Sequence, residues 1–439
     1  MLNIDLIPHR SAMRAGSADP QKLFVLLKLI PEARVANARP PLAFALVVDT
    51  SGSMYEAAED QKGKQKKIDQ AIQAAHTLID DVRLEERDRL AVVQFSSGAR
   101  VLRALDPLND RQPAHAAVEE LRKYGGGTRM DAGMEQALQE LVKVGPDQAK
   151  RAILLTDGQT TNARGCKELS VRFGAANAPI IAIGIGDEYN ADLLRDVAEA
   201  SGGRPYHLQK LGDLPSILNQ ELASSVREVV TDLQAEVKQV KGVSLSALTR
   251  VYPSLAEVTA AEAPYRLGNV AAGDYTMFLL EFTIAGLARP VSRVRLAQLL
   301  LHATAPGLQQ QDDFSPEDLF VTFSDDERAI AQVDEEVLGY VRQKNVDNLV
   351  HQAVGQATHN PAQARQTLQM ASNMTQRLGN AAMTQTLRQA LDELDQTGKL
   401  TGNTSRTMSL GSRTKTVKTG SLNQQGLPSD DEIRRLTGV

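Results

Sequence analysis

Short apolar runs alternate with longer segments of helical spacing over the first half of the chain. The runs lie at residues 43–48, 90–95, 152–156 and 180–185, and each has the length of a buried strand. The segments between and after them repeat apolar residues every three or four positions, which predicts helices over residues 65–82, 114–123, 131–144, 191–200 and 214–229. Alternating strands and helices are typical of a parallel sheet with helices on both faces. The pattern therefore predicts an α/β domain, doubly wound and mostly parallel, at residues 40–230.

A second pattern, with a period of two residues, follows this domain. It runs through stretches such as YTMFLLEFTIA and LFVTFSDD, with Gly and Pro between them. The stretch KLFVLLKLIP, before the α/β domain, has the same character. We therefore expect a β-sandwich at residues 231–325 that also takes the N-terminal strands of residues 1–39. In this arrangement the α/β domain is inserted into the sandwich.

The last part of the chain divides into two further regions. Residues 326–399 are rich in Gln and Ala, with apolar residues at three- and four-residue spacing, which predicts a small helical bundle or hairpin. Residues 400–439 have few large apolar side chains and many Ser, Thr, Gly, Lys and Arg. Such a composition cannot offset the entropy of ordering, so we expect a flexible tail.

Composition narrows the classes of partner. The 439 residues are 42% hydrophobic and carry a formal net charge of -5, without the broad basic field that binds nucleic acid. No run approaches the roughly 20 apolar residues that span a membrane, and the first residues lack the pattern of a signal peptide. Cys166 is the only cysteine, which suits a reducing compartment. We expect a cytoplasmic protein with no nucleic-acid or membrane partner.

Candidate chemistry gathers where the predicted strands end. In DTSGS, Asp49, Ser51 and Ser53 stand at alternate positions just after a strand. Thr128 in GGGTRMDAG and Asp157 in ILLTDGQT belong to loops at the same edge of the sheet. Two carboxylates and three hydroxyls favour Mg²⁺, Mn²⁺ or Ca²⁺ over Zn²⁺ or Cu²⁺.

These three stretches, in this order, resemble the von Willebrand factor A (VWA) domain of bacterial cytosolic proteins and its metal-ion-dependent adhesion site. The resemblance covers about residues 40–230. It implies that Ser51, Ser53 and Thr128 bind the metal directly or nearly so, while Asp49 and Asp157 often act through water. It also implies that one coordination position stays open for a Glu or Asp of a partner protein. Residues 131 and 156 are weaker candidates for neighbours of this site.

Other chemistries fit these residues less well. YGGGT lacks the Gly-Lys-Ser/Thr of a phosphate-binding P-loop, and GIGD at residues 184–187 follows the fourth strand rather than the first. A phosphohydrolase of the aspartyl-phosphate type would need an aspartate where Ser51 stands. A serine nucleophile needs a histidine base, and the nearest candidate, His207, is better explained as a structural residue. We predict no enzymatic activity.

Two functions follow from the resemblance. The first is a scaffold that binds a protein partner through the metal. The second is an accessory subunit of a ring AAA ATPase that remodels proteins or inserts metals, because bacterial VWA proteins often resemble partners of such ATPases. The order of domains also looks like that of calcium-activated chloride channel subunits, although no membrane segment supports a pore.

The tail offers a point of regulation. TSRTMSLGSRTKTVKTGS alternates hydroxyl and basic residues and contains no acid, so a phosphate would meet cations there. The predicted sites are Thr407, Thr414 and Thr416. A Ser/Thr kinase and a forkhead-associated (FHA) protein that reads phosphothreonine are then expected partners, since VWA proteins are often linked with both. The alternative is a tail that is merely solvated.

Overall fold

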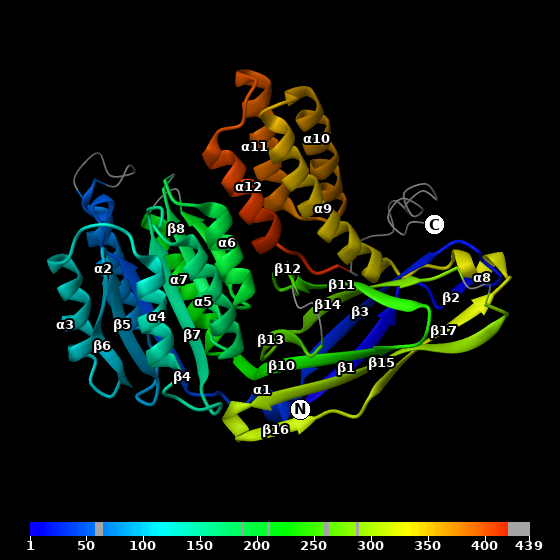
Figure 1. Cartoon of the computed structure of the whole chain (residues 1–439), viewed down its shortest axis with the longest axis horizontal. Coiled ribbons are helices and arrows are strands. Elements are labelled where there is room, and N and C mark those ends of the chain that lie inside the picture. The colour runs from blue at the N-terminus through cyan, green and yellow to red at the C-terminus, as the bar shows by residue number, and fades with distance from the viewer. Residues whose placement is uncertain (58–64, 187, 209–210, 259–262, 287–288, 420–439) are drawn as a thin grey trace.

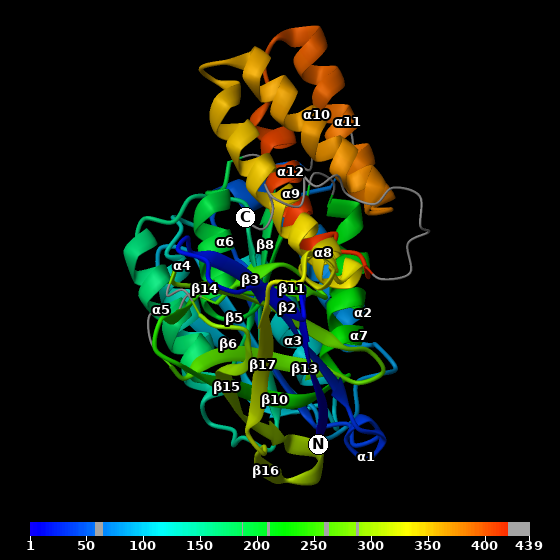
Figure 2. The same cartoon turned by 90° about the vertical axis from the view of Figure 1, so that its right-hand side faces the viewer.

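The chain folds into three parts, which Figure 1 shows as an α/β unit, a pair of β-sheets beside it and a group of helices above both. The computed structural model describes residues 1–57, 65–186, 188–208, 211–258, 263–286 and 289–419. The last 20 residues of the predicted tail, 420–439, therefore lie outside the described residues. In Figure 2 the helices α9 to α12 again stand on one side of the other two parts.

The α/β unit is built on one six-stranded sheet in the order β6-β5-β4-β7-β8-β9. All neighbours are parallel except β5 and β6. The strands are β4 (Leu42–Asp49), β5 (Arg89–Phe95), β6 (Ala99–Pro107), β7 (Ala149–Thr156), β8 (Ile180–Ile185) and β9 (Arg204–Leu208). The helices are α2 (Lys67–Ile79), α3 (Gln112–Glu120), α4 (Met130–Leu141), α5 (Ala163–Ala175), α6 (Ala191–Ala200) and α7 (Leu214–Ser225).

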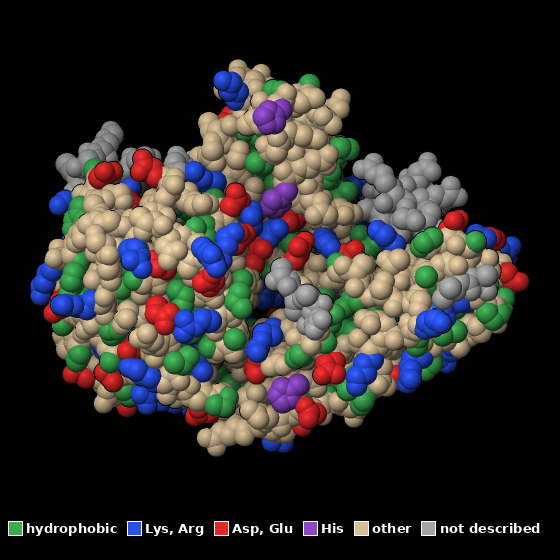
Figure 3. Space-filling model, in the orientation of Figure 1, with side chains coloured by type: hydrophobic (Ala, Val, Ile, Leu, Met, Phe, Trp, Pro, Cys, Tyr) green, Lys and Arg blue, Asp and Glu red, His purple; other side chains and the backbone are tan. Residues whose placement is uncertain are grey.

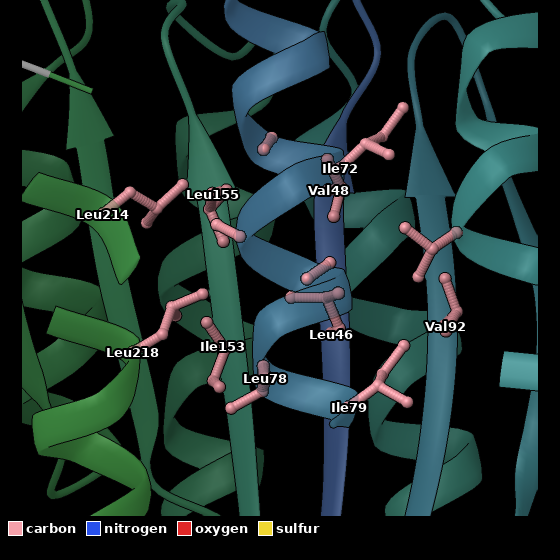
Figure 4. Close-up of a cluster of buried hydrophobic side chains, with 14 of the residues drawn as sticks. Leu46, Val48, Ile72, Leu78, Ile79, Val92, Ile153, Leu155, Leu214 and Leu218 are labelled. Atoms are coloured by element: carbon pink, nitrogen blue, oxygen red, sulfur yellow. The ribbon is translucent and has the colours of Figure 1, made fainter. Parts of the chain in front are cut away.

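The central strand β4 explains why this sheet is covered on both faces. All eight of its residues are buried. Phe44, Leu46 and Val48 point into one core with α2, α3 and α7, whereas Ala45 and Val47 point into another with α4, α5 and α6. Figure 4 shows the first core, where Leu46 and Val48 meet side chains of α2. The predicted doubly wound α/β fold is confirmed.

Helix α5 and the edge strands β6 and β9 were not predicted. Only four of the thirteen residues of α5 are buried, so its apolar period is weak in a sequence such as ARGCKELSVRFGA. Edge strands bury fewer of their side chains than central strands do, and only two of the nine residues of β6 are buried. Such elements are recognised only once the rest of the sheet is in place.

Two further sheets pack face to face beside the α/β unit. One has the order β1-β3-β14-β11-β12 and the other β13-β10-β15-β17-β2, with β16 paired to β15. Their buried residues form one shared core. The strands are β1 (Leu2–Pro8), β2 (Ala12–Arg14), β3 (Gln21–Pro31), β10 (Glu228–Gln239), β11 (Val243–Tyr252), β12 (Ala256–Glu257), β13 (Tyr265–Ala271), β14 (Thr276–Ile284), β15 (Ser292–Ala305), β16 (Gln310–Asp313) and β17 (Glu317–Ser324).

The start of the chain belongs to this sandwich. Strand β3 pairs with β14 along nine residues, from Gln21 opposite Ile284 to Leu29 opposite Thr276. After β3 comes only the short helix α1 (Ala33–Ala36) before β4 begins the α/β unit. The α/β unit thus lies between two strands, β3 and β10, of the sandwich.

The helical region consists of α8 (Glu327–Ala331), α9 (Glu335–Ala357), α10 (Pro361–Arg377), α11 (Ala381–Thr397) and α12 (Gly402–Thr414). The first turns of α9 cover the sandwich, since Val337, Tyr340 and Val341 pack against β3, β11 and β14. The rest of α9 packs with α10, α11 and α12 in a separate core. None of the helices in the described part of the chain combines the length and apolar content needed to cross a bilayer.

The prediction of a flexible tail from residue 400 is wrong for residues 402–414, which form α12. Thr401 caps the helix by accepting a hydrogen bond from the Thr404 amide. Met408 is fully buried and Leu410 is 6% exposed. A few apolar residues suffice here because polar side chains of α12 also find partners in other parts of the molecule.

Helix α12 connects all three parts. Arg413 pairs with Asp347 of α9 and with Glu199 of α6, and its backbone oxygen accepts a hydrogen bond from Leu255 in the sandwich. Asn403 approaches His207 of β9 at 2.6 Å. These contacts are made between residues far apart in sequence, so composition alone could not reveal them.

Candidate metal centre

The end of β4 folds back around its own carboxylate. Asp49 is fully buried, and its Oδ1 accepts a hydrogen bond of 2.8 Å from the Ser51 amide. A 3₁₀ turn, η1 (Gly52–Tyr55), follows at once. As a result the hydroxyls of Ser51 and Ser53 lie together, with 3.1 Å between their Oγ atoms.

The end of the neighbouring strand β7 joins this group. Asp157, 1% exposed, accepts a hydrogen bond of 2.7 Å from Ser53 Oγ at its Oδ1. The Thr156 hydroxyl donates to Asp49 Oδ2 at 2.6 Å. The two strands are parallel neighbours, so their ends bring two carboxylates and three hydroxyls into one cluster.

Thr128 approaches from a third loop, just before α4. A Cβ added to Gly158 would lie 3.4 Å from Thr128 Oγ1 and 3.8 Å from Ser53 Oγ, so glycine leaves a small space between these hydroxyls. Two backbone hydrogen bonds hold the loops together. Gly52 donates to the Gly126 oxygen at 3.0 Å, and Thr161 donates to the Thr128 oxygen at 3.1 Å.

The two carboxylates are only partly neutralised by the chain itself. Burial raises the pKa of Asp49 to about 6, and the nearby charge of Asp157 adds to this rise, although hydrogen bonds from Thr156 and Ser51 oppose it. Asp157 has a cationic partner, since Lys67 Nζ of α2 lies 2.7 Å from its Oδ2. Lys67 could not be expected from the sequence, because nothing in the lysine-rich stretch KGKQKKID shows which ammonium reaches the strand edge.

The donor set fits a hard divalent cation. In the described ranges no three His, Cys, Asp or Glu side chains are grouped to hold a metal, so hydroxyls must supply much of the coordination. Oxygen donors of this kind suit Mg²⁺, Mn²⁺ or Ca²⁺. The two carboxylates are buried, whereas Ser53 and Thr128 are half-exposed. A cation held here would meet protein oxygens on one side and solvent on the other.

Comparison with known families agrees with this geometry. Residues 44–220 match the family model of the von Willebrand factor type A domain. This part of the chain is a VWA domain. An uncharacterised protein of Synechocystis is 29% identical over 206 residues, and a mouse protein, calcium-activated chloride channel regulator 3A-1, is 25% identical over 227 residues. The matches cover 46% and 48% of this chain, but only 46% and 23% of those relatives.

Solved structures extend the likeness beyond the VWA domain. A von Willebrand factor type A protein from Catenulispora acidiphila is 20% identical with a TM-score of 0.77, covering 95% of this chain and 98% of that one. The ArnB paralog VWA2 from Sulfolobus acidocaldarius is 15% identical with a TM-score of 0.61, covering 95% and 100%. At such identities the likeness concerns the fold, which these proteins share over nearly the whole chain.

Not every residue singled out from the sequence joins the hydrogen bonds of this cluster. Residue Asp131 binds Arg129 and Asn162 instead. His207 contacts Tyr189 and Asn403 on the side that faces α12. The remaining three predicted residues, the threonines proposed as phosphorylation sites, lie within or just after α12: Thr407, Thr414 and Thr416.

Proposed function

We propose that the protein is a non-enzymatic scaffold, whose VWA domain holds a divalent cation that binds a Glu or Asp of a partner protein. The observation that carries the proposal is the convergence of oxygens from three loops. Ser53 Oγ lies 3.1 Å from Ser51 Oγ and 2.7 Å from Asp157 Oδ1, and Thr128 borders the same space.

Each residue has a distinct role in this proposal. Ser51, Ser53 and Thr128 would offer their hydroxyl oxygens to the cation. Both carboxylate oxygens of Asp49 already accept hydrogen bonds, so this residue chiefly orients the loop and supplies negative charge. A bound cation would supply an electrophilic centre for an incoming carboxylate. Mg²⁺ is the first candidate, with Mn²⁺ and Ca²⁺ as alternatives.

The surface favours a local interaction rather than a broad electrostatic one. On the face shown in Figure 3, Lys and Arg side chains are interspersed with Asp and Glu. A partner would then be selected by the cation and its immediate surroundings, because mixed charges produce little long-range attraction.

The test is a pull-down from native lysate, in Mg²⁺ and in EDTA, read by mass spectrometry. The Ser51→Ala/Ser53→Ala double variant should lose the partners that EDTA removes. A matched control, Ser17→Ala/Ser315→Ala, changes one half-exposed and one exposed serine of the sandwich and should keep these partners. Partners that bind equally well in EDTA and to both variants would contradict metal-bridged capture. An AAA ATPase among the metal-dependent partners would favour an accessory subunit over a signalling scaffold.

Phosphorylation of the threonines stays a proposal of the same kind. Thr414 Oγ1 donates to the Leu410 oxygen at 2.9 Å, and Thr416 Oγ1 donates to the Pro253 oxygen at 2.5 Å. A phosphate on either would replace these hydrogen bonds and add about 1.5 to 2 negative charges. Phosphorylation by a Ser/Thr kinase, and recognition of the phosphothreonine by an FHA protein, would therefore require this segment to detach from the rest of the protein. Mass spectrometry of the protein purified from its own cells would detect the phosphate.

A further inference from the structure

A second cluster of ionisable side chains lies on the VWA domain, where α2 and α3 pack together. His76 and Asp80 stand four residues apart at the end of α2, and His115 and Glu119 stand four residues apart in α3. Residues four apart share one helix face. The four side chains, here called the α2–α3 cluster, meet across the contact between the helices.

Each imidazole is held by a carboxylate of the opposite helix. His76 Nε2 lies 2.8 Å from Glu119 Oε1, and His115 Nε2 lies 2.9 Å from Asp80 Oδ1. An ionised carboxylate can only accept hydrogen bonds, so each Nε2 carries a proton. In a neutral ring the other nitrogen, Nδ1, is then an acceptor with a free lone pair.

These two acceptors face each other. His76 Nδ1 and His115 Nδ1 are 2.6 Å apart. The ring centroids are 4.9 Å apart with planes at 27°, a separation reached only when both Nδ1 atoms lie near the line between the ring centres. Two lone pairs directed at one another repel unless a cation lies between them. The cation is either one shared proton or a metal ion.

We propose that His76 and His115 form a binding site for a borderline transition-metal ion, with Zn²⁺ as the representative. Imidazole nitrogen is a preferred ligand of such ions. In protein metal sites the second nitrogen of a ligating histidine usually donates to a carboxylate, which fixes the ring. Both rings of the α2–α3 cluster already have this support. The oxygen-rich centre at the strand edge, by contrast, suits hard cations.

The cluster has the access that an incoming ion needs. The side chains of His76 and His115 are 28% and 20% exposed. A Zn²⁺ ion with tetrahedral bonds of about 2.0–2.1 Å needs nitrogens about 3.3 Å apart. The rings must therefore separate by about 0.7 Å from their 2.6 Å contact. Within the described residues no third His, Cys, Asp or Glu completes a metal-binding group, so water fills the remaining positions.

The carboxylates are positioning residues in this proposal. Arg122 Nε donates to the second oxygen of Glu119 at 3.0 Å, which keeps that carboxylate in place while its Oε1 holds His76. Asp80, the residue directly after α2, performs the same task for His115. Loss of such a supporting carboxylate typically lowers metal affinity about 10–100-fold.

The experiment is a calorimetric titration of the full chain with Zn²⁺, in excess Mg²⁺ to saturate the strand-edge centre. The wild type should bind one equivalent of Zn²⁺ that His76→Gln and His115→Gln do not bind. His302→Gln is the matched control, because His302 pairs with Asp313 at 2.7 Å and should bind as the wild type does. Glu119→Gln should bind the same equivalent about 10–100-fold more weakly.

Three results separate the alternatives. Equal Zn²⁺ uptake by the wild type and both histidine variants would overturn the proposal and leave a shared proton between the rings. Loss of uptake in His302→Gln would overturn it too, since the effect would not belong to the cluster. Asp49→Ala should keep the Zn²⁺ equivalent, which distinguishes this site from the strand-edge centre. Melting curves without metal identify any variant that fails to fold. If one histidine variant fails, the Zn²⁺ titration of the other histidine variant tests the proposal.

Discussion

Replacement of Arg413 by Met tests whether α12 is a docked helix or part of a flexible tail. Methionine keeps much of the length and apolar surface of arginine but removes the charge. The guanidinium pairs with Glu199 of α6 and lies 3.2 Å from Asp347 of α9. Its loss would therefore remove the ion pairs that join α12 to the VWA domain and to α9.

The expected cost follows from burial. The side chains of Arg413, Asp347 and Glu199 are 10%, 4% and 15% exposed. Removing one partner of a buried pair costs about 3–5 kcal/mol, because the other charge stays buried. Ser412 still donates to Asp347, so we expect the low end, about 3 kcal/mol. Burial lowers the pKa of Arg413 to about 10, so the side chain is charged at neutral pH.

The assay is hydrogen exchange of the full chain read by mass spectrometry on peptides from α12. A loss of about 3 kcal/mol raises the opening equilibrium of the helix roughly a hundredfold, and exchange should speed up by that factor. The control is Arg365→Met, which removes an Arg-Asp pair between α10 and α11 whose side chains are 50% and 46% exposed. Such a pair contributes at most about 1 kcal/mol, so exchange should change less than about fivefold.

Two outcomes would refute the reasoning. The first is exchange of wild-type α12 as fast as that of an unstructured peptide, which would restore the prediction of a flexible tail. Alternatively, Arg413→Met could behave like Arg365→Met, and then the buried charges would not hold α12 in place.

Three further changes test other parts of the structure. Lys67→Met should tighten Mg²⁺ binding about tenfold in calorimetry, the effect of removing one charge about 6 Å from a double charge in a water-like medium; weaker binding would show that Lys67 supports the site through Asp157. Burial, aided by Arg10, lowers the pKa of His9 to about 3. Below about pH 6.5 the unfolded chain thus binds more protons at His9 than the folded chain does. The free energy of unfolding therefore decreases as the pH is lowered, by about 2 kcal/mol at pH 5. In urea unfolding, His9→Asn should not show this decrease at low pH. The prediction would be contradicted if the free energy of unfolding of wild type and variant changed with pH in parallel. Gly203→Ala places a Cβ 2.0 Å from the Ile180 oxygen and should cost about 2 kcal/mol in the same assay; an unchanged midpoint would contradict this contact.

The strand-edge centre was largely predictable because its signal is local. Asp49, Ser51 and Ser53 follow one apolar run directly, and Asp157 follows another. Parallel strands end at one edge, so the sequence was enough to expect these oxygens together. Lys67 was not predictable, since its pairing with Asp157 depends on how α2 lies across the sheet.

The C-terminal region shows where composition fails. Residues 402–414 have the polar composition of a disordered segment, yet they form a helix. Their stability comes from partners such as Asp347 and Glu199, which stand 66 and 214 residues earlier in the chain. The α2–α3 cluster illustrates the same limit. Each helix shows a His and an acid four residues apart, but only the packing of the helices brings the two imidazoles together.

The insertion of the VWA domain between β3 and β10 also decides how mechanical force would travel through the molecule. Only two residues separate the end of α7 at Ser225 from the start of β10 at Glu228. This junction is too short to extend much under tension. The ion pair between Arg413 and Glu199 adds a third connection, which joins the VWA domain to α12. A pull on a partner held at the strand edge would therefore load the sandwich directly, instead of first straightening a linker. Domains joined in this way would transmit tension with little change in their relative orientation.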